Sequence, residues 1–165
     1  VNIKKKTVKL GVGQPAGYVD NIQLDVEGRK WSVDFINTGV PHAIVFLNDY
    51  KNIDVNGLGR KMRYHGCFKP SGANVNFVVV KDKHNLLIRT YERGVESETL
   101  ACGTGSVAAA VSAGIRGYCW SPVRCQTAGG QILTVYFKNN GDPHCLKDVC
   151  LEGPANITFE GEVRI

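Results

Sequence analysis

ACGTGSVAAAVSAG, residues 101–114, is the segment from which the fold of this chain is most readily predicted. Alanine has the strongest helix propensity, so we predict a helix over 103–114, with Thr104 or Ser106 as its N-cap and Gly114 at its end. The side chains are small and mostly apolar on every side of that helix. Such a helix can bury all its faces only where strands surround it closely. The stretch therefore predicts a central helix held against or inside a strongly curved sheet.

Short stretches of alternating polarity, separated by turn residues, make up most of the remaining sequence. Residues 22–26 and 30–36 flank a Glu-Gly-Arg turn and predict a hairpin, and 43–47 is typical of a strand buried on both faces. Residues 48–68 have mixed polarity and favour at most one short helical turn. Further strands are expected at 76–80, 86–91, 122–126, 131–137, 148–151 and 157–159, with turns at 128–130 and 139–142. We therefore expect a single α+β domain with about eight strands, mostly antiparallel.

The composition fits one folded domain rather than a disordered or membrane-spanning chain. The 165 residues are 43% apolar, and 20 basic against 15 acidic residues give a net charge of +5. No apolar run approaches the roughly 18 residues that a membrane span needs, and the first residues lack the apolar core of a signal peptide. Aromatic residues are not interleaved with the basic clusters at 4–6 and 60–63, as a nucleic-acid groove would require. We therefore expect a cytoplasmic protein with no nucleic-acid partner and no membrane partner.

The six cysteines are expected to be free thiols. They are Cys67, Cys102, Cys119, Cys125, Cys145 and Cys150. A chain of this length does not need disulfides to hold its core together, and a reducing compartment keeps thiols free. No pair has C-x-x-C spacing, and a zinc site that uses His144 is only weakly supported. We therefore expect no metal.

Cys102 stands where a loop enters the predicted helix, and that position favours a thiolate. Unpaired N–H groups and the helix dipole stabilise negative charge there, so we expect the pKa of Cys102 to fall from about 8.5 towards 7. Gly103 and Gly105 would let a substrate carboxylate approach the backbone N–H groups. Upstream, the carboxylates of Glu92, Glu96 and Glu98 lie between the preceding strand and the thiol, and a carboxylate next to the thiol could orient it and accept its proton. Arg93 could hold a substrate carboxylate. On spacing alone, a buried structural cysteine is an equally good interpretation of Cys102, and surface charge is the simpler interpretation of any of these charged residues taken singly.

At these residues the sequence resembles the diaminopimelate epimerase family. The sequence ERG at 92–94, followed by ETLACGTG at 98–105 and the alanine-rich helix, is similar to the family's second catalytic motif. The other similarities are TGVPHA at 38–43, VFLND at 45–49, NVNFV at 74–78, GPA at 153–155 and FEG at 159–161. The resemblance therefore spans nearly the whole chain.

The resemblance implies a cofactor-independent isomerase of lysine and peptidoglycan-precursor biosynthesis. Diaminopimelate epimerases interconvert LL- and meso-diaminopimelate with two cysteines, of which one thiolate removes the α proton while the other thiol delivers a proton to the opposite face. Here Cys102 would be one of the pair, with its thiol polarised by Glu92, and His42 would orient the other cysteine. The residues implied to bind the substrate are Asn74, Glu92, Arg93 and, through their backbone N–H groups, Gly103 and Thr104.

The second catalytic cysteine of the family has no counterpart in this chain. The family carries it in a Cys-Gly-Asn-Gly motif of the first domain, and none of the other five cysteines here is followed by glycine. We expect these five to be core or surface thiols. Val40 is a smaller departure, because many members carry at this position an Asn that contacts the substrate.

The resemblance thus implies that residues 1–165 are the carboxy-terminal lobe of a two-lobed protein, whose active site lies in the cleft between pseudo-symmetric halves. The missing amino-terminal lobe would supply the second cysteine, so we expect this chain to be inactive alone. Residues from about 155 to 165 would pack on that lobe. Diaminopimelate is then the small-molecule partner, and a homodimer is one assembly open to the chain. The alternatives are another isomerase of this fold, such as a proline racemase-like enzyme, and a non-catalytic remnant that acts as a binding module.

Overall fold

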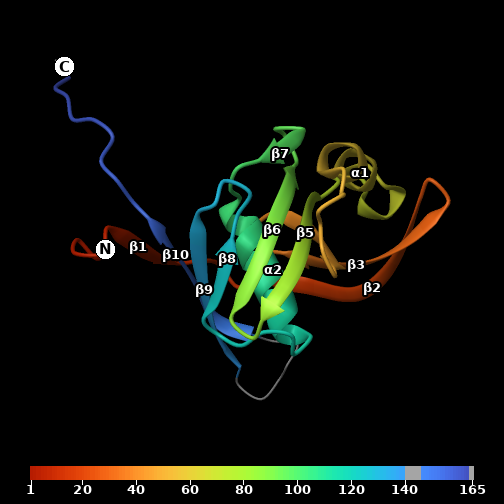
Figure 1. Ribbon diagram of the computed structural model, residues 1–165, viewed down its shortest axis with the longest axis horizontal. Helices are drawn as coiled ribbons and strands as arrows, with labels where there is room; N and C mark the ends of the chain where they lie inside the picture. Colours follow the sequence, from red (N-terminus) through yellow and green to blue (C-terminus); the bar gives the residue numbers. More distant parts are fainter. Residues whose placement is uncertain (140–145, 164–165) are drawn as a thin grey trace.

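The computed structural model describes residues 1–139 and 146–163 (Figure 1). The strands are β1 (Thr7–Gly11), β2 (Ala16–Val26), β3 (Arg29–Asn37), β4 (Pro41–Leu47), β5 (Asn74–Asp82), β6 (Asn85–Glu92), β7 (Ser97–Thr99), β8 (Val123–Gln126), β9 (Ile132–Asn139) and β10 (Leu146–Pro154). The helices are α1 (Val55–Arg63), the short 3-10 helix η1 (Gly66–Phe68) and α2 (Gly103–Ile115). No helix in these two ranges is long and apolar enough to cross a membrane.

All the strands belong to one curved sheet. Neighbours follow the order β1-β10-β9-β8-β6-β5-β4-β3-β2, with β7 beside β6. The pairs are antiparallel except for β4 with β5 and β6 with β8. All the strands of this order between β1 and β2, from β10 to β3, pack against α2, which crosses behind β5 and β6 in Figure 1. The expected α+β fold with a central helix is therefore confirmed.

The central helix forms where the sequence predicts it, but its ends differ from the prediction. The N-cap is Cys102, because its Sγ accepts the backbone N–H of Gly105 at 3.3 Å, and neither Thr104 nor Ser106 has that place. The C-cap is Arg116, so Gly114 lies inside the helix. A Cβ on Gly114 would lie 2.7 Å from the Phe137 ring. Glycine is therefore needed there for close packing rather than to end the helix.

The alternation along each strand divides the interior into two cores, one around α2 and one around α1. In β4, Ile44 lies in the first core, whereas Ala43 and Val45 lie in the second, so this strand is buried on both faces as predicted. The predicted hairpin is β2 with β3, and the predicted pair 76–80 with 86–91 is β5 with β6. The apolar residues of the hairpin that face the second core are Ile22, Leu24, Val26, Trp31, Val33 and Phe35.

The expectation for residues 48–68 is wrong, because this region contains the nine-residue helix α1 and the short helix η1. Two glycines, Gly57 and Gly59, lower the helix propensity of this segment, so the sequence does not predict the helix. The contacts around α1 explain why each of these positions carries glycine. Asp54 caps the helix by accepting the N–H of Gly57 at 2.9 Å, and a Cβ on Gly59 would lie 2.5 Å from the Cβ of Tyr91 in β6.

Several strand predictions also need correction. Residues 157–159 are not a strand, because no described strand pairs with them, and Ile157 and Phe159 are 80% and 85% exposed. β1 and β7 were not predicted, since β1 is mostly exposed and β7 has only three residues. The turn at 128–130 is confirmed by the bond from the Gly130 N–H to the Thr127 carbonyl, whereas residues 140–142 of the other predicted turn lie outside the described residues.

A buried ion pair ties the C-terminal end of α2 to the β2–β3 hairpin. Asp34 in β3 is 1% exposed and forms a two-point contact with Arg116, with Nε and Oδ2 at 2.7 Å. The hydroxyls of Ser112 and Tyr18 donate to the same carboxylate at 2.8 and 3.0 Å. Burial alone would raise the pKa of Asp34, but these hydrogen bonds outweigh it and hold the pKa below its ordinary value. The carboxylate therefore stays charged inside the fold.

We predict that Asp34→Ala lowers the free energy of unfolding by about 3 kcal/mol, because it leaves the partly buried Arg116 guanidinium without its partner. Lys61→Ala, which removes one member of the exposed Lys61–Glu27 pair, should change it by less than about 1 kcal/mol. Denaturant unfolding measures both. The Asp34 contribution should be complete above the ordinary carboxyl pKa of about 4 and should disappear as the pH falls through the lowered folded-state pKa. Equal effects of the two substitutions would contradict this prediction.

Gly59→Ala should destabilise the fold by about 1–3 kcal/mol, although alanine is the better helix former, because its methyl group would overlap the Tyr91 side chain. The matched control is Gly66→Ala, since a Cβ there would meet no atom within 4 Å. Thermal unfolding of the two variants distinguishes overlap at Tyr91 from a general effect of adding a methyl group. Stabilisation by Gly59→Ala would show that α1 is not packed as described.

Candidate active site

Polar side chains gather on the inner face of the sheet at the end where α2 begins. Side chains two residues apart point to the same face of a strand, so His42 shares the face of Ile44, which packs in the core around α2. In register, Ile44 lies beside Asn76 of β5, and Asn76 lies beside Thr90 of β6. Asn74 lies two residues before Asn76 in β5, and Glu92 lies two residues after Thr90 in β6, so both side chains point to this same face of the sheet. The apolar core around α2 therefore ends in a polar cluster at this end of the sheet.

Cys102 joins this polar cluster at the first turn of α2. It is 7% exposed, and its Sγ contacts the Thr104 hydroxyl at 3.5 Å in addition to accepting the Gly105 N–H. Burial raises the pKa of the Cys102 thiol, the hydrogen bonds from Thr104 and Gly105 oppose this effect, and the nearby Glu92 carboxylate adds to it. The expected lowering of the pKa is therefore wrong. The N–H groups of the helix start are present, but they do not compensate for the loss of water around the sulfur.

His42 is a neutral imidazole inside the fold. It is fully buried, and burial, with a further contribution from the charge of Arg93, lowers its pKa to about 3. Its Nδ1 lies 3.0 Å from the Asn76 side-chain nitrogen. Its Nε2 is buried and has no hydrogen-bond partner among the described residues. One polar atom of this site is therefore left for a partner that these residues do not supply.

Asn74 and Arg93 are linked to each other, but the Arg93 guanidinium turns away to a neighbouring cleft. The Asn74 side chain donates to the Pro41 carbonyl at 3.2 Å and accepts the backbone N–H of Arg93 at 2.8 Å. The Arg93 guanidinium donates to the Ser71 carbonyl at 3.3 Å. It lines a cleft of about 560 Å³ together with residues 67–72 and parts of β2 and β3. Arg93 thus lies at the edge of the site rather than beside Cys102.

The structure places the other predicted residues together at this end of the fold. Gly103 is partly exposed and Thr104 is exposed, whereas the next two residues are buried, so only the beginning of the first turn of α2 faces outward. The Thr104 carbonyl lies 3.4 Å from the Thr38 hydroxyl. Sequence reasoning missed Asn76 and Thr90. The signal for Asn76 is the alternation Asn-Val-Asn at the start of a strand that is otherwise apolar, since two Asn residues two positions apart must share one face.

The remaining cysteines do not add to the site. Cys119 and Cys125 are buried in the core around α2, Cys67 is exposed, Cys150 is partly buried, and all four are free thiols. The prediction that they are core or surface thiols is therefore confirmed for these four. His144 and Cys145 lie outside the described residues. Within the described ranges, no group of three or more His, Cys, Asp or Glu side chains could hold a metal.

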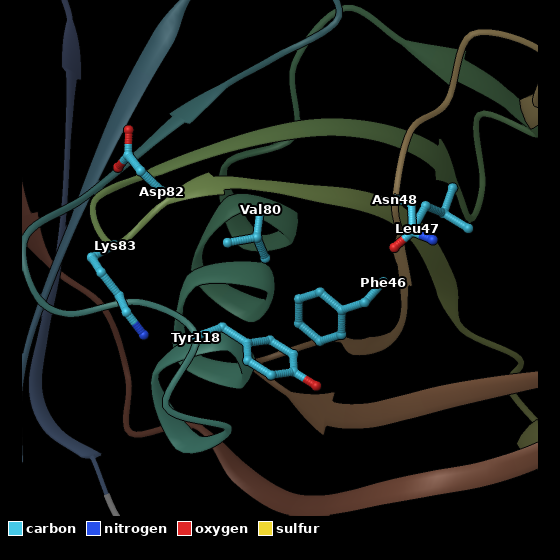
Figure 2. Close-up of a pocket in the computed structure, with 7 residues that line it drawn as sticks. All are labelled: Phe46, Leu47, Asn48, Val80, Asp82, Lys83 and Tyr118. Carbon is cyan, nitrogen blue, oxygen red and sulfur yellow. The ribbon is translucent and has the colours of Figure 1, made fainter.

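A second hollow, of about 720 Å³, lies at the opposite ends of β4 and β5 (Figure 2). It is lined by Phe46, Leu47, Asn48, Val80, Asp82, Lys83 and Tyr118. Phe46 and Tyr118 meet edge to face with ring centres 5.2 Å apart, and Asp82 already accepts hydrogen bonds from His84 and Asn85. This hollow contains no thiol and no unpartnered buried group, so the polar cluster around Cys102 is the stronger candidate.

Comparison with known proteins gives one consistent result. A family model described as diaminopimelate epimerase matches residues 35–157. The diaminopimelate epimerase of Aquifex aeolicus is 44% identical over 141 residues, which are 85% of this chain and 49% of the relative. That of Methanocella arvoryzae is 40% identical over 171 residues, covering 98% of this chain and 57% of the relative. The chain therefore spans about half the length of the curated relatives it matches.

Solved structures with low sequence identity share the fold. A probable proline racemase from Agrobacterium radiobacter superposes with a TM-score of 0.71 at 14% identity, over 97% of this chain and 54% of that chain. A PhzF-family phenazine biosynthesis protein from Bacillus anthracis gives a TM-score of 0.64 at 16% identity, over 100% of this chain and 63% of that chain. At such identities the likeness concerns the fold alone.

We predict that Cys102 in this chain is alkylated slowly at neutral pH and that its rate rises with a midpoint above the ordinary thiol pKa of about 8.5. Glu92→Gln should lower that midpoint and speed alkylation at neutral pH about threefold, because it removes a negative charge that disfavours the thiolate. Mass spectrometry of the Cys102 peptide measures both rates. Glu160→Gln, at an exposed position far along the chain, is the control. Slower alkylation in Glu92→Gln would contradict the prediction.

Proposed function

This chain belongs to the diaminopimelate epimerase family, and we propose that it is one lobe of an epimerase that interconverts LL- and meso-diaminopimelate by proton transfer between two cysteines, without a cofactor. Its place would be in the cytoplasmic supply of lysine and peptidoglycan precursors. The observation that carries the proposal is Cys102 itself. The thiol caps a buried helix, beside the carboxylate of Glu92 and at the polar end of the sheet.

Each group near Cys102 has a use in this chemistry. The exposed start of α2 would offer the N–H groups of Gly103 and Thr104 to the substrate's α-carboxylate, where the positive end of the helix dipole favours an anion. The α carbon is then held near Sγ, and the sulfur donates or removes a proton at one face. With a raised pKa, Cys102 rests as a thiol, so it serves first as the proton donor. After the transfer it is a thiolate, which the N–H of Gly105 and the hydroxyl of Thr104 stabilise.

Inversion of a carbon centre needs a second acid or base on the opposite face of the substrate. The thiols of Cys119 and Cys125 cannot provide it, because both are buried behind α2 in the core, and the Cys125 thiol donates to the Ser106 carbonyl. We propose that the second cysteine comes from the amino-terminal lobe. The neutral imidazole of His42 would orient that cysteine, and Asn74, Glu92 and Arg93 would complete substrate binding.

The position and the exposed apolar side chains of the tail that follows β10 support an interface between the two lobes beside the site. A Cβ on Gly103 would lie 3.1 Å from Leu151 of β10, so β10 passes the start of α2 shortly before the tail begins. In the tail, Ile157, Phe159 and Val163 are 80%, 85% and 87% exposed. Their spacing of two or four residues puts them on one face of an extended segment. We propose that residues from about 155 onward pack on the first lobe, as one half of an enzyme whose two lobes close around the substrate.

The two other functions that the sequence leaves open are less well supported. A proline racemase-like isomerase shares this fold at only 14% identity, whereas the family model and the 44% identical relative both carry the diaminopimelate epimerase description. A non-catalytic remnant has no need of a fully buried histidine whose Nε2 has no partner among the described residues, at the same end of the fold as a capping thiol. An activity test decides between the remnant and the enzyme lobe.

We predict that this chain, incubated with LL-diaminopimelate in deuterated water, gives neither α-deuterium nor the meso isomer, because one cysteine cannot complete the inversion. Mixed with or fused to the half of the Aquifex aeolicus relative that this chain does not match, it should give both products. Mass spectrometry and chiral separation measure them. Cys102→Ser should abolish the products, and Cys67→Ser, at an exposed thiol, should retain them. Exchange by the chain alone, or full activity of Cys102→Ser in the two-lobed protein, would sink the proposal.

A further inference from the structure

The side chain of Asn76 contacts both the His42 ring and the helix turn that carries Cys102. It is fully buried on the inner face of the sheet, between β4 and β6. Its nitrogen lies 3.0 Å from His42 Nδ1 and 3.2 Å from the Ala43 carbonyl oxygen, and its oxygen lies 3.0 Å from the Thr90 hydroxyl. The same oxygen would lie 2.5 Å from a Cβ on Gly105, so the amide also packs against the turn that carries Cys102.

The Ala43 carbonyl determines which way round this amide lies. A carbonyl oxygen only accepts hydrogen bonds, so the group that faces it must be the NH₂ group of Asn76. The Thr90 hydroxyl is able to donate or accept and therefore follows the amide rather than directing it. Because an NH₂ group has two hydrogens, one is donated to Ala43 and the other to Nδ1 of His42.

The orientation of the amide in turn determines the position of the proton on His42. A nitrogen that accepts a hydrogen bond is unprotonated, so in the neutral ring the proton is on Nε2. Nε2 is the buried atom that has no hydrogen-bond partner in the part of the chain that the structure describes. A buried donor without an acceptor costs about 1–3 kcal/mol, which an incoming acceptor would recover. A thiolate sulfur is an acceptor of that kind.

We propose that Asn76 is a positioning residue that fixes His42 in the Nε2–H tautomer, so that His42 donates a hydrogen bond to the acceptor that completes the site. This purpose rests on the proposed function, in which the acceptor is the sulfur of the second cysteine, but the tautomer itself does not. Through Gly105 the same amide also sets the distance between the His42 ring and the helix turn of Cys102. Substitution of Asn76 should therefore disturb proton transfer both at Cys102 and at the second cysteine.

The test is the ¹⁵N NMR spectrum of the histidine rings in the labelled chain. His42, one of four histidines, is assigned by the loss of its signals in His42→Gln. The expected spectrum is that of the neutral Nε2–H tautomer, unchanged between about pH 5 and 8, where an ordinary histidine titrates. An Nδ1–H tautomer or a charged ring in the unmodified chain would overturn the proposal, whatever the variants do.

Asn76→Asp replaces the NH₂ donor with an oxygen, so Nδ1 should become protonated. Asn74→Asp is the matched control, because it makes the same chemical change two residues earlier, where the side chain contacts Pro41 and Arg93, and it should leave Nδ1 unprotonated. If Asn76→Asp does not fold, Thr90→Val serves instead. It leaves the Ala43 carbonyl in place and should keep the Nε2–H tautomer, whereas a switch to Nδ1–H would overturn the argument that Ala43 directs the amide.

In the two-lobed protein, Asn76→Asp should reduce α-deuterium exchange on the order of 100-fold or more, since a wrong histidine tautomer has an effect at least that large in other enzymes. The two proposals fail in different ways. An Nε2–H tautomer in a two-lobed protein that gives no exchange would overturn the proposed function and leave the role of Asn76 in the tautomer intact. Exchange in a two-lobed protein whose His42 is the Nδ1–H tautomer would overturn the role of Asn76 alone.

Discussion

The sheet lies so close to α2 that there is no room for larger side chains where strand side chains meet the helix. The helix carries small side chains on every face, and a glycine stands near each of its ends. A Cβ on Gly105 would overlap the Asn76 oxygen, and a Cβ on Gly114 would overlap the Phe137 ring. A larger residue at either position would push the strands outward. The short distance between helix and sheet brings the Asp34 carboxylate of β3 within hydrogen-bond reach of the C-terminal end and packs the Asn76 amide of β5 against the first turn.

Those polar atoms fix the helix in a way that alanine contacts cannot. An evenly apolar helix surface packs almost as well after a small rotation or slide, so apolar burial alone does not define the position of its first turn. Polar side chains at both ends reduce this freedom. At the C-terminal end, Asp34 binds Ser112 and Arg116. At the N-terminal end, the Thr38 hydroxyl lies 3.4 Å from the Thr104 carbonyl, and the Asn76 amide packs against the first turn. A carboxylate at the opposite end of the helix therefore contributes to the position of the Cys102 sulfur.

The sequence predicts the parts of this arrangement that depend on local pattern. The central helix, the β2–β3 hairpin and the doubly buried β4 all follow from propensity and alternation. The helix α1 does not, because both of its glycines lower the helix propensity, and Gly59 is required by its contact with Tyr91 of β6, which is far away in the sequence. Motif resemblance selects the candidate residues, and the structure brings most of them to one end of α2. The motif resemblance does not reveal Asn76, because the contacts of its side chain with β4 and β6 exist only when the three strands lie side by side.

The expected pKa of Cys102 is wrong for the same reason, because it depends on tertiary structure rather than on local sequence. Position at a helix start favours the thiolate, but burial of the sulfur and the Glu92 carboxylate disfavour it more strongly, and both depend on how the strands close around the helix. The result fits a thiol that must carry a proton before it can donate one. In the proposed two-cysteine reaction, one cysteine starts protonated and the other starts charged. A lobe that keeps its own thiol neutral and leaves the Nε2 of His42 without a partner then provides the acid, and it needs the other lobe to provide the base.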